Sequence, residues 1–323
     1  MDVPLWAWIV FACLVAAMLA VDLFGHRHAH IVGFREAAVW SAVWVGVALV
    51  FAVAVGVTLG PTAGTEFTTA WLLEKSLSVD NLFVFALIFG YFKVPREYQH
   101  RVLFLGVLGA LLLRGVFLAA GVAVVDRFTA VLFAFAAVLV YSGVKLLRDD
   151  DESYDPGSSI AVRVLRKVMR VRDEYVGTRF FVREAGRLVA TPLLAVVVAI
   201  EAADVVFAVD SVPAVLAVSD DAFIVYSSNA FAILGLRALY FLLAGMLDRF
   251  HYLGAGLAVI LIFIGAKLAL AAAHELIHPA IPELPSAASL AVIVTVLAVA
   301  IIASLRRAVP DRQSVLTAGP APR

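Results

Sequence analysis

Charged residues, cysteines and phosphate-binding glycine loops are all scarce in this chain. Asp, Glu, Lys and Arg make up 15% of the 323 residues, and the basic and acidic residues balance at 25 each. This balance excludes the net positive charge with which proteins attract nucleic acid. The single cysteine, Cys13, excludes an intrachain disulfide. Because there is no glycine-rich phosphate loop, ATP-driven transport by this chain alone is not supported.

The low content of charged residues is matched by a high content of apolar residues. They make up 63% of the chain, and the mean hydropathy is +0.99. A soluble domain has about 45–50% apolar residues. The composition therefore predicts a membrane protein whose main partner is the lipid bilayer.

Nine stretches are long and apolar enough to cross a membrane, which takes about 20 residues as a helix. We therefore expect an all-α, polytopic membrane protein with a transmembrane domain over residues 1–305. The start of the chain lacks the basic region of a signal peptide, so the first stretch is expected to be retained. The nine stretches are 5–24, 37–59, 67–91, 102–122, 128–147, 191–217, 223–247, 252–273 and 286–305.

Lys and Arg residues gather in alternate connections between these stretches. Of the 25, 19 lie in one set of connections and in the C-terminal tail, and only Arg127 lies in the other set. Cytoplasmic loops of membrane proteins retain Lys and Arg. The pattern therefore predicts an N-terminus outside the cell and a C-terminus in the cytoplasm.

One cytoplasmic loop, 148–190, is long. Ile160, Val164 and Val168 recur there at helical spacing with basic residues between them. This pattern is typical of an amphipathic helix on an anionic membrane surface. The tail over 306–323 contains three prolines and is expected to be disordered.

Two blocks of three stretches, about 66–147 and 191–273, carry charged residues in the same order. Each has an acid, a second acid six residues later, an arginine, and then Gly-x-Lys. The order runs through Glu74, Asp80, Arg114 and Lys145 in the first block and Asp204, Asp210, Arg237 and Lys267 in the second. Because the two blocks enter the membrane from opposite sides, we expect inverted repeats with a substrate site at mid-membrane. Duplication without transport is the alternative.

Five acids lie deep inside the predicted spans, where each costs at least about 2.5–3.5 kcal/mol unless it is compensated. They are Glu74, Asp80, Glu201, Asp204 and Asp210, and the cations inside spans are Lys75, Arg114, Lys145, Arg237 and Lys267. Simple pairing of acids with cations is one interpretation. A cation site is the other, because Glu201 and Asp204 lie three residues apart on one helix face. Like charges that close repel unless a cation or a proton lies between them.

Helical geometry groups the candidate ligands. At about 100° per residue, Glu74 and Asn81 share one face, and Asp204 and Ser211 share the equivalent face of the other helix. The second acid of each block points about 120° away, toward a buried arginine or a helix break near Pro213. We therefore predict a pathway for a divalent cation formed by Glu74, Asp80, Asn81, Glu201, Asp204, Asp210 and Ser211, with the five cations as supporting charges.

The chemistry of these groups narrows the cargo. Carboxylate, amide and hydroxyl oxygens are hard ligands that suit Mg²⁺, Ca²⁺ or Mn²⁺. We expect Asp80 and Asp210 to pair with Arg114 and Arg237, which leaves the other three acids to take up protons when the site is empty. Desolvation and mutual repulsion favour that neutral form. Metal binding then displaces protons, which gives a route to proton-coupled export.

Long segments around these residues resemble the TerC/Alx family of integral membrane proteins. They are Glu74–Asn81, Ala190–Leu193 with Glu201 and Asp204, Phe207–Ala214, and Asn229–Arg237 with Lys267. The resemblance runs from about Asp22 to Leu305 and departs at Ala203, where a hydroxyl residue is expected. It implies metal homeostasis in a bacterial cytoplasmic membrane, with manganese export the best-supported role. Some members are named for tellurium resistance and some respond to alkaline pH, and the family is similar to the lysine-exporter superfamily.

Two other functions compete with transport. One is a stress-response or scaffold protein that transports nothing. The other is a membrane metalloprotease, because His274-Glu275-Leu276-Ile277-His278 matches the zinc pattern H-E-x-x-H. Two prolines follow that motif and no third ligand is evident, so we expect no enzyme and no permanently bound cofactor. His26, His28 and His30 form a polar loop that either binds metal loosely or is simply solvated.

Overall fold

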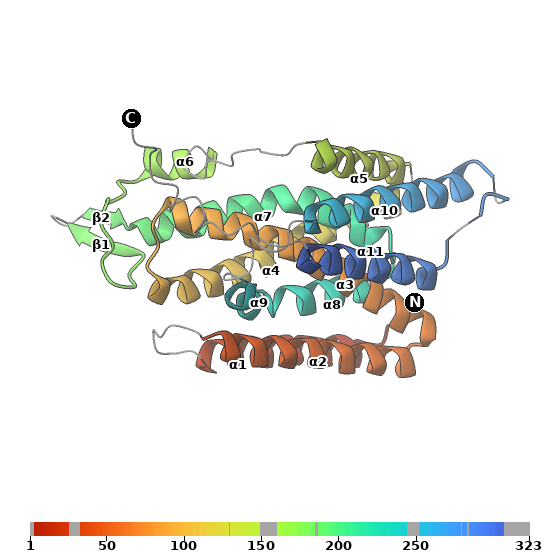
Figure 1. The fold of residues 1–323 in the computed structure, drawn as a ribbon, viewed down its shortest axis with the longest axis horizontal. Helices are drawn as coiled ribbons and strands as arrows, with labels where there is room; N and C mark the ends of the chain where they lie inside the picture. The colour runs from red at the N-terminus through yellow and green to blue at the C-terminus, as the bar shows by residue number, and fades with distance from the viewer. Residues whose placement is uncertain are drawn as a thin grey trace, which may run out of the picture.

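The computed structural model describes residues 3–25, 33–128, 130–148, 160–184, 187–243, 252–278, 280–282 and 284–306. These residues form a bundle of helices and one two-stranded hairpin (Figure 1). The elements are α1 (Leu5–Gly25), α2 (Phe34–Thr58), α3 (Pro61–Tyr91), α4 (Arg96–Arg127), α5 (Val131–Arg148), α6 (Ile160–Val168), β1 (Phe181–Glu184), β2 (Arg187–Ala190), α7 (Pro192–Leu216), α8 (Ala222–Ile233), α9 (Leu236–Leu243), α10 (Leu253–Leu276) and α11 (Ser286–Arg306). The all-α polytopic prediction is confirmed.

Eight membrane spans are found in the described residues by length and composition, with α8 and α9 counted together as one. The ninth predicted stretch, 67–91, lies in α3. This helix has 31 residues, more than the roughly 20 that a span requires, but it is too rich in charge to be recognised by composition. Glu74, Lys75 and Asp80 all lie within it. The count of nine stays a prediction.

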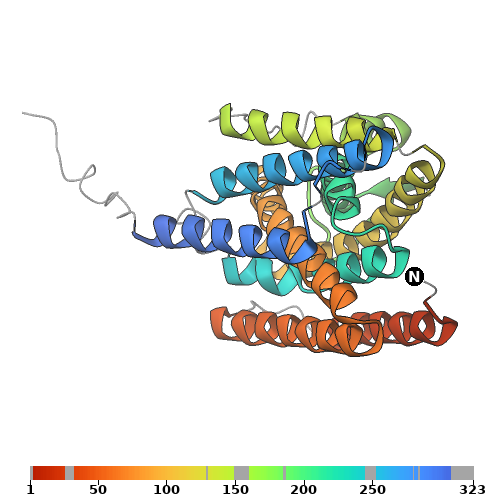
Figure 2. The same cartoon turned by 90° about the vertical axis from the view of Figure 1, so that its right-hand side faces the viewer.

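The helices are arranged around α3, which packs against α2, α7, α8, α10 and α11. α1 and α2 form one side of the bundle and α5 lies on the opposite side (Figure 1). The view in Figure 2 shows the same separation, with α1 and α2 in red and α5 in yellow-green. The middle of α3 is therefore far from the surface of the bundle, and charged groups there must find partners within the protein.

Local sequence explains where several helices begin and break. α3 starts with Pro61, whose missing N–H costs nothing in the first turn. Asp221 caps α8 by accepting hydrogen bonds from the N–H groups of Phe223 (2.9 Å) and Ile224 (3.3 Å). The break predicted near Pro213 is wrong, because α7 continues to Leu216 and Pro213 falls in its last turn. The break lies instead in the next span, between α8 and α9 at Leu234 and Gly235.

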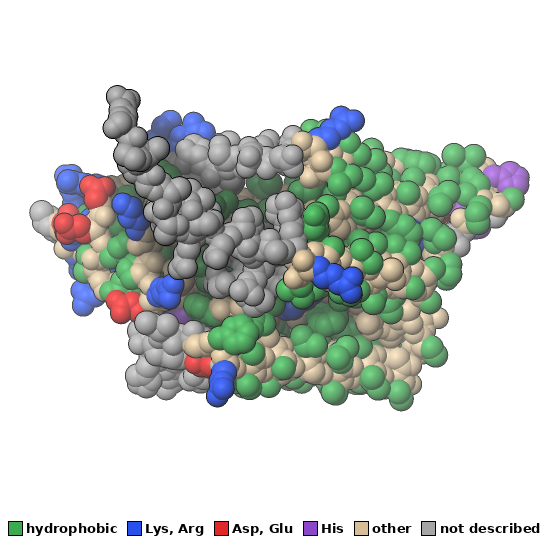
Figure 3. All heavy atoms as spheres, viewed as in Figure 1, with side chains coloured by type: hydrophobic (Ala, Val, Ile, Leu, Met, Phe, Trp, Pro, Cys, Tyr) green, Lys and Arg blue, Asp and Glu red, His purple; other side chains and the backbone are tan. Residues whose placement is uncertain are grey.

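The predicted amphipathic helix in the 148–190 loop is present as α6, and Val162 on it is fully buried among side chains of α7. The antiparallel hairpin of β1 and β2, which pairs Phe181 with Ala190, was not predicted. Tyr175 fixes this loop to the end of α3 by donating to the carbonyl oxygen of Phe92 at 2.6 Å. Charged side chains gather on the end of the molecule that carries α6 and the hairpin (Figure 3). The histidines at 26, 28 and 30 and the tail from 307 on lie outside the described residues.

Candidate functional site

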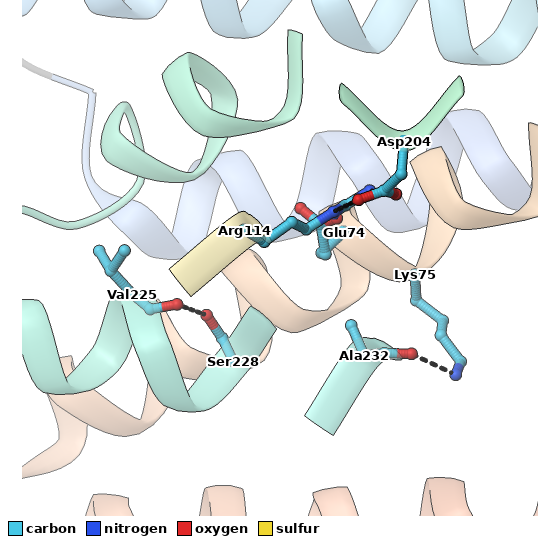
Figure 4. Close-up of polar contacts among 7 residues, drawn as sticks. All are labelled: Glu74, Lys75, Arg114, Asp204, Val225, Ser228 and Ala232. Atoms are coloured by element: carbon cyan, nitrogen blue, oxygen red, sulfur yellow. Dashed lines mark hydrogen bonds and ion pairs between the residues drawn. The ribbon is translucent and has the colours of Figure 1, made fainter. Parts of the chain in front are cut away.

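Arg114 on α4 joins acids from two other helices in the centre of the bundle. Its Nη1 forms an ion pair with Glu74 of α3. Its Nη2 lies 3.1 Å from Asp204 Oδ1, and its Nε lies 3.4 Å from Asp204 Oδ2. Figure 4 shows the guanidinium pointing into the space between the two carboxylates. The contact with Asp204 is the two-pronged arrangement that makes arginine a selective partner for carboxylates.

These three side chains are almost completely removed from solvent. Arg114 is 1% exposed, Glu74 is 0% exposed and Asp204 is 3% exposed. Asn81 lies on the same face of α3 as Glu74, about two turns further along the helix, and completes the cluster. In the amide orientation that satisfies both of its ends, Asn81 accepts from Arg114 Nη2 at 3.3 Å and donates to the carbonyl oxygen of Leu77 at 3.1 Å. The predicted common face of Glu74 and Asn81 is therefore seen in this cluster.

Glycines on α4 allow α4 to approach α7 closely. A Cβ on Gly106 would lie 3.0 Å from Ile200, and one on Gly109 would overlap the carboxylate of Glu201. Glu201 lies one turn before Asp204, as predicted. Both of its carboxylate oxygens are buried without a hydrogen-bond partner among the described residues. The structure thus separates two kinds of acid: Glu74 and Asp204, which share a cation, and Glu201, which has no partner within the described part of the chain.

A cavity of about 550 Å³ lies beside the cluster. Asp210 of α7 borders it and accepts a hydrogen bond of 2.6 Å from Ser142 Oγ of α5. The hydroxyl of Ser211 is buried there without a partner among the described residues. The cavity is lined by α3, α4, α5, α7 and α10 through residues that include Asn81, Arg114, Tyr141, Ser142, Lys145, Asp210 and Ser211.

The arginine partner predicted for Asp210 is wrong, and the one predicted for Asp80 stays a prediction. Arg114 pairs with Glu74 and Asp204, and Asp210 accepts a hydrogen bond from Ser142. Arg237 on α9 pairs with Asp22 of α1 at 2.5 Å and also donates to the carbonyl oxygen of Asp22 at 3.0 Å. The reason is that helical periodicity fixes which residues share a face but not which neighbouring helix lies opposite that face. The side chain of Asp80 lies outside the described residues.

The remaining supporting cations take separate positions. Lys75 points away from Glu74 (Figure 4) and donates to the carbonyl oxygen of Ala232 at 2.9 Å. That carbonyl lies at the end of α8, where the helix breaks and its last carbonyls lose their helical donors. Lys145 lines the cavity with Asp210, and Lys267 is buried on α10.

No ready-made cluster of three or more His, Cys, Asp or Glu side chains that could hold a metal occurs in the described residues. Sequence reasoning also missed Asp22, Ser142 and Gly109. Asp22 lies within the first predicted stretch, so an acid inside a span was the available signal. Gly109 carried no signal, because its role depends on Glu201 from a helix far along the chain.

The H-E-x-x-H motif does not form the helix face of a zinc protease. α10 ends at Leu276, two residues before His278. His274 Nδ1 lies 2.7 Å from the carbonyl oxygen of Ile281, and His278 Nδ1 accepts from the N–H of Ala280 at 3.1 Å. The backbone therefore occupies one ring nitrogen of each histidine.

The fold and the buried charges define a class: a polytopic α-helical membrane protein with an internal ion-pair cluster. Residues 59–312 match the model of the integral membrane protein TerC family. The chain belongs to this family, as the resemblance of its motifs implied.

Relatives with high identity extend over nearly the whole chain. An "uncharacterized membrane protein STKORF319" of Myxococcus xanthus is 43% identical over 299 residues, which cover 92% of this chain and 91% of that one. A "putative membrane-bound redox modulator Alx" of Escherichia coli (strain K12) is 44% identical over 271 residues, covering 81% and 84%. An "uncharacterized membrane protein" of Rickettsia bellii is 38% identical over 309 residues, covering 95% and 100%. No solved structure matches the chain.

Proposed function

We propose that this protein is a secondary transporter of a divalent metal cation, with Mn²⁺ export from the cytoplasm as its role. The observation that carries the proposal is the buried cluster in which Glu74 and Asp204, from different helices, share Arg114 beside a cavity. Ionisable groups inside a membrane are expensive and typically mark an ion or substrate pathway. The choice of Mn²⁺ and of the outward direction follows from the family resemblance.

The ligand chemistry supports a hard cation. The cluster offers two carboxylates and the amide oxygen of Asn81, and the cavity adds Asp210, Ser142 and Ser211. Oxygen donors of these kinds suit Mn²⁺, Mg²⁺ and Ca²⁺. Because the described residues contain no preformed cluster of metal ligands, binding requires the side chains to rearrange around the ion.

Inverted repeats and alternating access form part of the proposal. The packing of α5 against α10 supports it, because the two helices use equivalent residues. A Cβ on Gly143 would lie 2.8 Å from the carbonyl oxygen of Ala258, and a Cβ on Gly265 would lie 3.0 Å from that of Ala136. Ala258 lies seven positions before Gly265, and Ala136 lies seven positions before Gly143. Each glycine therefore contacts the equivalent position on the other helix. Such reciprocal contacts are typical of two elements related by a two-fold axis.

The proposed orientation places α6 and the hairpin in the cytoplasm and the N-terminus outside, in the inner membrane of a bacterium. The charged end in Figure 3 supports it, since Lys and Arg are retained on the cytoplasmic side. The relatives reported above are bacterial proteins.

Proton coupling is assigned to Glu201 in this proposal. Its carboxyl is buried without a hydrogen-bond partner among the described residues, and an ionised carboxylate there would carry its full desolvation cost. Arg114 already compensates Glu74 and Asp204. Glu201 is therefore the acid that exchanges a proton when the metal enters and leaves.

A non-transporting scaffold or stress-response role is the alternative, in which the buried charges only hold the helices together. The name of the Escherichia coli relative, "putative membrane-bound redox modulator Alx", would add electron or thiol chemistry, but the single Cys13 does not form an intrachain thiol pair. Purified protein in liposomes separates these functions. With Mn²⁺, Ca²⁺ and Mg²⁺ offered in turn under an imposed pH gradient, we expect Mn²⁺ flux that depends on the gradient. Absence of flux for all three ions would refute the transport proposal.

A further inference from the structure

Arg114 lies in the position that a metal ion shared by Glu74 and Asp204 would occupy. The guanidinium contacts both carboxylates and also reaches the amide oxygen of Asn81. These three groups are hard oxygen donors that belong to the predicted pathway. Without Arg114, two carboxylates would face each other in a space that excludes water, which is costly unless a cation compensates them.

A divalent ion and the guanidinium cannot occupy this space together. Both are cations, and each uses the same carboxylate oxygens. Like charges within about 4 Å repel strongly where water does not screen them. Binding of a metal between Glu74 and Asp204 therefore requires Arg114 to leave.

A neighbouring cavity can accept the displaced side chain of Arg114. Arg114 itself borders the cavity of about 550 Å³, and Asp210 borders the same cavity from α7. Asp210 holds a hydrogen bond from Ser142 at 2.6 Å and faces the cavity together with Lys145. A displaced guanidinium that moves into the cavity thus shares it with the carboxylate of Asp210.

We propose that Arg114 is a tethered counter-cation that exchanges with the transported metal. It compensates Glu74 and Asp204 when the site is empty, and it moves into the cavity to Asp210 when the metal binds. The role deepens the proposed transport function and rests on it. Metal release is then driven by the return of Arg114, so that the buried carboxylates always have a cation.

Removal of Arg114 tests the competition directly. Mn²⁺ binding to the purified full-length protein is measured by calorimetry at pH 8 for wild type, Arg114→Gln and Arg237→Gln. If Arg114 leaves the carboxylates about one time in a hundred, its removal tightens Mn²⁺ binding about 100-fold, and we expect a gain of at least about tenfold. Arg237 is the matched control, because it is also buried but pairs with Asp22, away from the site. Its substitution is expected to leave the affinity unchanged.

Arg114→Lys covers the case in which Arg114→Gln does not fold. Lysine keeps the charge but loses the two-pronged contact with Asp204, so Mn²⁺ displaces it more easily and binding is again tighter than in wild type. Transport falls in both variants, because the returning cation is weakened or absent. Unchanged or weaker Mn²⁺ binding in the folded variants would overturn the exchange and leave Arg114 a structural residue.

A double-mutant cycle tests the second position of Arg114. Asp210→Asn alone is expected to weaken Mn²⁺ binding, because the displaced arginine loses its partner. In the Arg114→Gln background the same substitution should have no effect. An equal effect in both backgrounds would instead make Asp210 a direct metal ligand and overturn the proposed movement. If wild-type protein binds no metal at all, the transport proposal itself fails, which is distinguishable from a wild type that binds and variants that do not gain.

Discussion

Replacing Gly109 by alanine tests the buried position of Glu201. Gly109 lies in the middle of α4, and the added Cβ would overlap the Glu201 carboxylate. Glu201 would then have to move within a closely packed contact between α4 and α7. The same substitution at Gly115, on the same helix, is the matched control, because nothing lies within 4 Å of a Cβ built there.

The two variants are expected to change stability in opposite directions. Alanine in place of a helical glycine stabilises by up to about 1 kcal/mol, and Gly115→Ala should show most of this gain. Overpacking of a buried contact costs about 1–3 kcal/mol. Gly109→Ala is therefore expected to lose roughly 0–2 kcal/mol after the gain in helix propensity.

The measurement is the midpoint of thermal unfolding of the purified protein in one detergent. A further substitution, Glu201→Ala, removes the group that the new Cβ meets, so it should bring Gly109→Ala close to Gly115→Ala. If Gly109→Ala alone is as stable as Gly115→Ala, the contact between α4 and Glu201 is not as the structure has it and the reasoning is refuted.

Three further outcomes are expected. Lys75→Met leaves the carbonyl at the end of α8 without its donor and should lower stability by about 1–3 kcal/mol, whereas an unchanged unfolding midpoint would show that another donor replaces it. With Cys13 changed to serine, cysteines introduced at the exposed positions Thr62 and Arg163 should label from opposite sides of the membrane, and labelling from one side would contradict the orientation. Mn²⁺ affinity should rise between pH 6 and 8.5, because metal binding releases a proton, and Glu201→Gln should flatten that dependence; an equally steep profile in the variant would assign the proton elsewhere.

The sequence predicted the elements better than their contacts. Apolar runs gave the spans, and the buried charges showed which helices lie in the interior, since a charged residue facing lipid is too costly. The shared face of Glu74 and Asn81 followed from periodicity alone. The residue that contacts this face could not be predicted from periodicity. It is Arg114, which comes from another helix, α4, whose packing depends on Gly106 and Gly109.

The position of the helix break shows the same limit. Pro213 is a strong local signal for a break, yet α7 continues through it to Leu216. The actual break is at Gly235, where Lys75 from α3 compensates a carbonyl that the break leaves free. The donor to this carbonyl lies 157 positions away in the chain, so no local pattern contains the contact.

The most direct test of the central claim is Mn²⁺ flux into liposomes that contain the Asp204→Asn variant. Asp204 is buried in the cluster with Arg114, whereas Asp220 is exposed in the turn between α7 and α8. Wild-type protein and Asp220→Asn are expected to move Mn²⁺ at similar rates. Asp204→Asn, folded and inserted to the same extent, is expected to move no more than empty liposomes, and flux equal to that of wild type would contradict the account.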